Sequence, residues 1–169
     1  PGVMSGLQDV LFGDALNTNQ DNIDYYFDNT KYYDESAKNY RDDADSAYQR
    51  ARSLYDVNFN AYKSASRFSD TATVESLIEQ TYNTTKNIAE AVKSANNLIQ
   101  FYRDKANSHS VDTNPVSATH LANLDTYTGI TNSHLSNLLS ATNSLQTDKN
   151  SIISVQRSID EKQESLVNL

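Results

Sequence analysis

Residues 18–68 have the sequence TNQDNIDYYFDNTKYYDESAKNYRDDADSAYQRARSLYDVNFNAYKSASRF. Apolar or aromatic residues recur along this stretch at alternating spacings of three and four. A sustained period of 3.5 residues is typical of a helix whose apolar seam faces a partner helix. We therefore predict one long helix over residues 18–68. Small and aromatic side chains alternate along its seam, which consists of Ile23, Tyr26, Thr30, Tyr33, Ala37, Tyr40, Ala44, Ala47, Ala51, Leu54, Asn58, Ala61, Ala65 and Phe68.

Two further segments carry the same repeat and predict helices over residues 71–106 and 117–169. The apolar stripe of the first is wide, which indicates contact with more than one neighbour, as in a bundle. The stripe of the second narrows toward its C-terminus, as expected where a bundle thins to a two-helix contact. Polar, breaker-rich residues near Ser69 and from Asn107 to Pro115 predict the two turns. Short turns imply antiparallel neighbours.

Residues 3–12 predict a short amphipathic helix that stops at Gly13, and we expect it to pack against one end of the rod. No stretch predicts a strand, and a chain of 169 residues with only 4 Gly and 2 Pro has little material for the turns of a sheet. The predicted fold is therefore all-α. It is an elongated antiparallel bundle or coiled coil of three long helices and a short N-terminal helix, forming a single module over residues 1–169.

Composition and motifs exclude several classes of function. The formal net charge of −8 argues against binding to nucleic acid, which needs a basic footprint. No run approaches the ~20 apolar residues of a membrane span. The chain has no Cys, and its three histidines, His109, His120 and His134, lack the spacing of a shared metal site. We expect no metal, no cofactor and no enzyme activity.

Two clusters of residues allow more than one interpretation. The acidic residues Asp42, Asp43 and Asp45 alternate with basic ones, which favours a solvated, ion-paired helix face over a calcium site. A second set of aromatic residues lies outside the seam of the first long helix. It predicts packing on a third helix, or alternatively an aromatic groove for a small ligand. This set comprises Tyr25, Tyr32, Tyr48, Tyr55 and Tyr62.

The residue mix bears on location. Ser, Thr and Asn make up roughly a third of the chain, and together with the absence of Cys this is typical of an exported or surface protein. The chain opens at Pro1-Gly2 and closes inside a periodic segment, so we expect it to be a fragment of a larger protein. We predict an extracytoplasmic location and a parent protein anchored in a membrane.

Residues 3–13, VMSGLQDVLFG, and the stretch from Leu124 to Leu169 together resemble a known family. They are similar to the periplasmic adaptor subunits of efflux transporters, the HlyD-like membrane-fusion proteins, of minimal uncultivated bacterial lineages. In that family a helical hairpin projects as a rod and meets an outer-membrane channel or another partner at its tip. The resemblance implies a non-catalytic spacer and docking module with transporter or channel components as protein partners, and we also expect self-association.

The resemblance also implies a place for partner binding. Typical adaptors carry an Arg-Leu-Ser-like pattern at the tip, and its nearest match here is the partial one at Arg67, Phe68 and Ser69. With Asp70, these are the candidate partner-binding residues. The chain departs from the family in having three long predicted helices where the family has two. Two alternative functions stay open, an extracytoplasmic four-helix ligand sensor of the chemoreceptor type and a structural surface coiled coil.

Overall fold

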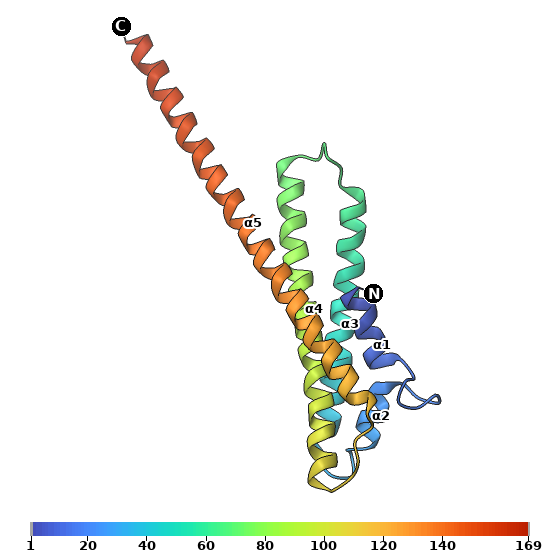
Figure 1. Cartoon of the computed structure of the whole chain (residues 1–169). Coiled ribbons are helices and arrows are strands. Elements are labelled where there is room, and N and C mark those ends of the chain that lie inside the picture. The colour runs from blue at the N-terminus through green and yellow to red at the C-terminus, as the bar shows by residue number, and fades with distance from the viewer. Residues whose placement is uncertain (1, 169) are drawn as a thin grey trace.

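The computed structural model describes residues 2–168, and this part of the chain is helical without a strand (Figure 1). The prediction of an all-α fold is therefore confirmed. The helix over residues 3–12 has the predicted bounds, and the last two helices begin and end within two residues of their predicted limits, except that Leu169 lies outside the described residues. The elements in chain order are α1 (Val3–Phe12), α2 (Asn22–Asp28), α3 (Ala37–Ser64), α4 (Thr71–Ser108) and α5 (Val116–Val167).

The prediction of one continuous helix over residues 18–68 is wrong, because turns at 29–36 separate α2 from α3. Short polar side chains stabilise this break by bonding to the backbone. The Thr30 hydroxyl donates to two carbonyls of the last turn of α2, at 2.8 and 3.1 Å. One carboxylate oxygen of Asp34 accepts from both the amide and the hydroxyl of Ser36. Such bonds compete with helical ones, so the apolar repeat continues across a segment that is not helical.

The three longest helices are antiparallel neighbours, and α4 lies between the other two (Figure 1). Helix α4 packs against both α3 and α5, whereas no Cα atoms of α3 and α5 come within 8 Å of each other among the described residues. Alanines line the contact between α3 and α4, where Ala44, Ala47 and Ala51 face a helix that buries Ala91 and Ala95. Small side chains at these positions let the two backbones approach closely.

The core lies at the end of the molecule that contains α1 and α2. We expected α1 to cover one end of the rod, but it lies lengthwise beside the long helices and contacts all four other elements. Its apolar face is fully part of the core. The largest fully buried apolar side chains come from four of the five helices and are Leu7, Val10, Leu11, Ile23, Tyr26, Val92, Leu98, Ile99 and Leu124.

Helix α5 leaves the bundle before it ends. Its seam is buried at Leu124 and Thr131, and its last ion pair with α4 joins the Nζ of Lys149 to a carboxylate oxygen of Glu75 at 2.6 Å. From residue 150 to residue 168 every side chain is exposed. These residues extend roughly 27 Å past the ion pair at 1.5 Å per residue, and they project beyond the turn between α3 and α4 (Figure 1).

None of the helices in residues 2–168 combines the length and the apolar character that crossing a membrane requires.

Candidate docking surface at the turn between α3 and α4

The turn at residues 65–70 joins the two helices of a hairpin and satisfies its own polar groups. The amide of Ser66 donates to the hydroxyl of Ser69 at 2.9 Å, and the amide of Phe68 donates to the hydroxyl of Ser66 at 3.1 Å. The Ser69 amide closes the turn by donating to the Ser66 carbonyl. The turn is therefore a defined structure that presents its remaining side chains to solvent.

The four predicted partner-binding residues lie together in this turn but have different roles. Phe68 is 81% exposed, and the guanidinium of Arg67 lies over its ring at 4.6 Å from the ring centre. The Ser69 hydroxyl accepts a hydrogen bond from the Ser66 amide within the turn. Asp70 is the N-cap of α4, and its carboxylate accepts from the amide of Thr73 at 2.7 Å. That hydrogen bond lowers the pKa of Asp70. Arg67 and Phe68 are thus the pair available to a partner.

Further exposed aromatic residues lie along α3 just before the turn. Tyr55 and Phe59 stack with their ring planes nearly parallel, the Nζ of Lys63 lies 4.7 Å from the Phe59 ring centre, and Tyr62 is exposed. The sequence shows them as aromatic residues outside the main seam. Tyr48, about two turns before this group, is buried against Phe12 of α1 at 4.8 Å between ring centres. The prediction that the second set of aromatic residues packs on a third helix therefore holds for Tyr48, which packs on α1. The aromatic side chains nearer the turn between α3 and α4 are exposed to solvent.

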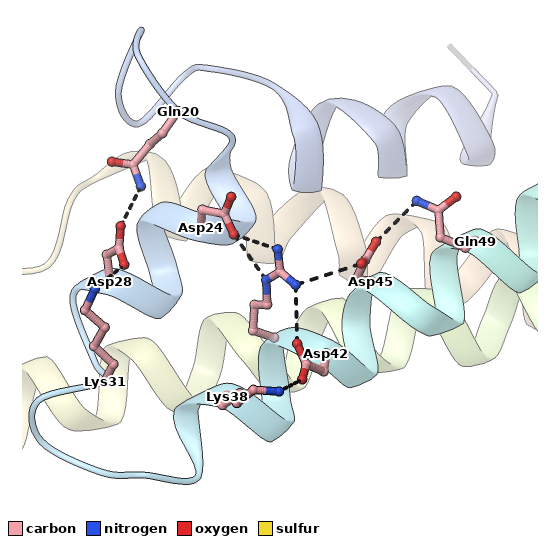
Figure 2. A network of polar contacts seen from close by, with 9 residues as sticks. Gln20, Asp24, Asp28, Lys31, Lys38, Asp42, Asp45 and Gln49 are labelled. Carbon is pink, nitrogen blue, oxygen red and sulfur yellow. Dashed lines mark hydrogen bonds and ion pairs between the residues drawn. The ribbon is translucent and has the colours of Figure 1, made fainter.

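The acidic cluster of α3 is an ion-paired face that attaches α2 to α3. Figure 2 shows Lys38 paired with Asp42, and the same network joins Asp24 of α2 to Asp42 and Asp45 of α3 through Arg41. The guanidinium of Arg41 donates twice to Asp24, at 3.0 and 3.1 Å. Residues 2–168 contain no group of side chains that could hold a metal ion. The ion pairs of Asp42 and Asp45 agree with the interpretation as a paired helix face.

The histidines lie in three different environments. His134 is exposed on α5, and His109 stacks on Tyr33 with 4.1 Å between ring centres. His120 is buried, and its Nδ1 lies 2.8 Å from the hydroxyl of Tyr26. The pairing of Tyr26 with His120 joins residues 94 positions apart, and no motif in the sequence indicates it.

A cleft of about 380 Å³ opens above the N-terminus of α1. Side chains of α3, α4 and α5 line it, among them Arg52, Tyr55, Thr84 and His134. Its size falls in the range of small-molecule sites, and its lining mixes polar and aromatic groups. Arg52 is already paired with Asp56 at 3.0 Å.

No protein-family model matches this chain, and no curated protein or solved structure is significantly similar to it.

Proposed function

We propose that the chain is the helical spacer and docking module of a periplasmic adaptor subunit of an efflux pump. In this role it has no catalytic activity and mediates protein–protein contacts during transmembrane export. The observation that carries the proposal is the hairpin of α3 and α4, whose turn presents Phe68 and Arg67 to solvent. The parent protein would be anchored in a membrane, with this module outside the cytoplasm.

A spacer has to keep its docking end at a fixed distance from the rest of the protein. Helix α3 has 28 residues and is roughly 42 Å long at 1.5 Å per residue. The close alanine packing of α3 on α4 and the self-contained turn both restrict bending. The buried core with α1 and α2 gives the hairpin a firm base. These features support a mechanical role.

The turn has the side chains that partner sites commonly use. Aromatic residues and arginine are enriched among the residues that contribute most to binding energy. Phe68 would enter an apolar pocket of the partner, and the five N–H donors of Arg67 would pair with carboxylate or carbonyl oxygens. The partner would be a transporter or channel component. Self-association through the exposed stripe of α5 is also part of the proposal, and sedimentation of the chain at increasing concentration tests it.

The test is to substitute the turn in the full-length protein. Arg67→Asp with Phe68→Ala should abolish partner binding and export, while far-UV circular dichroism and the Tm stay unchanged, because both side chains are exposed. A matched control is Arg50→Asp with Tyr32→Ala, an exposed arginine and an exposed tyrosine away from the turn. This control should bind and export normally. If the turn variant did so as well, the turn would not be the docking site.

The cleft above α1 favours one alternative, an extracytoplasmic sensor that binds a small ligand between its helices. A structural surface coiled coil is the other. The segments that the gene encodes on either side of this chain would distinguish the adaptor, the sensor and the structural coiled coil. Lipoyl-like β segments on both sides would support the adaptor, flanking transmembrane helices would support the sensor, and neither would support the structural role.

A further inference from the structure

One buried hydrogen bond connects α2 to α5 at the base of the molecule. It joins the hydroxyl of Tyr26, which is 0% exposed, to the Nδ1 of His120, which is 6% exposed, across 2.8 Å. The two rings also meet edge-on, with 6.2 Å between their centres. Helix α2 has only seven residues, so it cannot stay helical without such tertiary contacts.

The direction of this hydrogen bond follows from the burial of both groups. Burial is the largest cause of a raised pKa for the Tyr26 phenol, so the phenol keeps its proton and donates it to the bond. The Nδ1 of His120 must then be the acceptor, which requires an unprotonated nitrogen. Burial also lowers the pKa of His120, which favours the neutral ring.

Among residues 2–168 no carboxylate forms a hydrogen bond or ion pair with His120. The carboxylates of α2, Asp24 and Asp28, pair with Arg41 and Lys31, and Asp104 of α4 is exposed. The ring centres of Tyr25 and Tyr102 lie 6.2 and 5.1 Å from that of Tyr26. The nearest charge on α4 that the hydrogen bonds place at this contact is the positive one of Arg103, which donates to the hydroxyl of Ser117, one turn before His120, at 3.2 Å. The residues one turn away from His120 on α5 are uncharged. The single titratable residue of α1, Asp9, is exposed, and no Cα atom of α3 lies within 8 Å of one of α5 in the described part of the chain.

We propose that the Tyr26–His120 pair is an acid-sensitive latch, and that uptake of one proton by His120 releases α2 from α5. Protonation turns Nδ1 from an acceptor into a donor, and His120 is the one hydrogen-bond partner of the buried Tyr26 hydroxyl among residues 2–168. It also places an unpaired cation one turn from Ser117, to whose hydroxyl Arg103 donates. Release of α2 would uncover the apolar side chains of the core at this end. The latch is independent of the proposed docking function.

Amide hydrogen exchange of residues 22–28 at pH 7 and pH 5, corrected for the intrinsic exchange rates, tests the latch. In the open form His120 titrates near its ordinary pKa of about 6.5, so the opening equilibrium should rise up to about 25-fold over this interval. His120→Gln keeps an acceptor for Tyr26 but cannot take up a proton, and in this variant the protection of α2 should be the same at both pH values. His134→Gln removes an exposed histidine from the same helix and should leave the pH effect intact.

A second measurement does not depend on any variant folding. Histidine side-chain NMR of the unmodified chain should give His120 a pKa below the ordinary value. Equal protection of residues 22–28 at both pH values, or an ordinary or raised pKa for His120, would overturn the latch. An undiminished pH effect in the His120→Gln chain would do the same.

Discussion

Tyr127 of α5 lies directly over Gly6 of α1. A Cβ atom placed on Gly6 would lie 2.0 Å from the Tyr127 hydroxyl oxygen and 2.4 Å from the ring carbon that carries it. Gly6 itself is buried in the second turn of α1. The absence of a side chain there is what allows α1 to approach α5, since any other residue would occupy the space of the tyrosine ring.

Gly6→Ala should therefore destabilise the fold although alanine is the better helix former. Overpacking of a buried contact costs about 1–3 kcal/mol, against a gain of about 1 kcal/mol in helix propensity. We expect a net loss of stability in urea unfolding followed by circular dichroism. Tyr127→Ala, combined with Gly6→Ala, should cost less than the sum of the two single changes, because the clash is then gone. Strict additivity would contradict the contact.

Gly129→Ala should have the opposite effect. Gly129 lies within α5, and a Cβ atom placed there would meet nothing within 4 Å. Replacing an unhindered glycine inside a helix by alanine gains about 0.5–1 kcal/mol. The unfolding midpoint in urea should rise. An unchanged or lowered midpoint would mean that the backbone of α5 is not an ordinary helix at this point.

Leu124 and Leu166 occupy equivalent positions of the same heptad seam but have opposite environments. Leu124 is 0% exposed and Leu166 is 72% exposed. Leu124→Ala should cost about 2–5 kcal/mol by removing core packing, whereas Leu166→Ala should stay within about 0.5 kcal/mol of the parent chain. Urea unfolding of both variants at low protein concentration measures the difference. A large loss for Leu166→Ala would show that something covers this residue in solution.

Asp70→Ala should loosen the start of α4. The Asp70 carboxylate caps that helix by accepting from the Thr73 amide, and loss of an N-cap costs about 0.5–2 kcal/mol. Asp70→Ser keeps a capping oxygen and should retain most of the stability. Thermal unfolding distinguishes the two variants, and equal values for them would mean that the cap contributes nothing. A binding defect in Asp70→Ala alone would therefore be weak evidence for direct contact with a partner.

The ion pair of Asp34 with Lys105 should make stability depend on pH in the acid range. The Nζ of Lys105 lies 2.8 Å from Asp34, and this bond, followed by those from Ser36, holds the pKa of Asp34 well below its ordinary value. A carboxyl group with a lowered folded-state pKa stabilises the fold above its unfolded pKa, near 3.9, and loses that effect as the pH falls further. Asp34→Asn should therefore lower the urea midpoint at pH 7.

At pH 2 the difference between the Asp34→Asn variant and the parent chain should become smaller, because the Asp34 carboxyl group of the unfolded chain is then protonated and has to give up its proton to form the Lys105 pair. Asp43→Asn is the matched control, because Asp43 is exposed and makes no ion pair among residues 2–168. An equal effect of both variants at pH 7 would assign the loss to net charge and not to the Lys105 pair.

Periodicity was enough to predict α1, α4 and α5, because each carries an uninterrupted apolar stripe with clear limits. Gly13 and Asp70 mark two of those limits. The break between α2 and α3 was not predictable from the seam, since Thr30 and Tyr33 continue the heptad spacing. Hydrogen bonds from side chains to nearby backbone groups decide the conformation there, and the spacing of apolar residues carries no information about such bonds.

The candidate site was predicted in position but not in its division of roles. A turn near Ser69 and an N-cap at Asp70 or Thr71 follow from the residue types, and the structure has Asp70 as the cap. The exposure of Phe68 and the use of Ser69 within the turn do not follow from them. The Tyr26–His120 pair could not be found from the sequence at all. It forms only because α2 is a separate short helix, free to pack where a continuous helix would have carried Tyr26 elsewhere.

The exposed C-terminal end of α5 makes the local stability of this helix fall along its length. Residues 150–167 are all exposed, and a helix of this length without packing is marginal in water. Its helical state is propagated from the packed turns that precede Lys149. Amide protection should consequently fall from that residue outward, so that one end of α5 unfolds only with the core while the other frays and re-forms on its own.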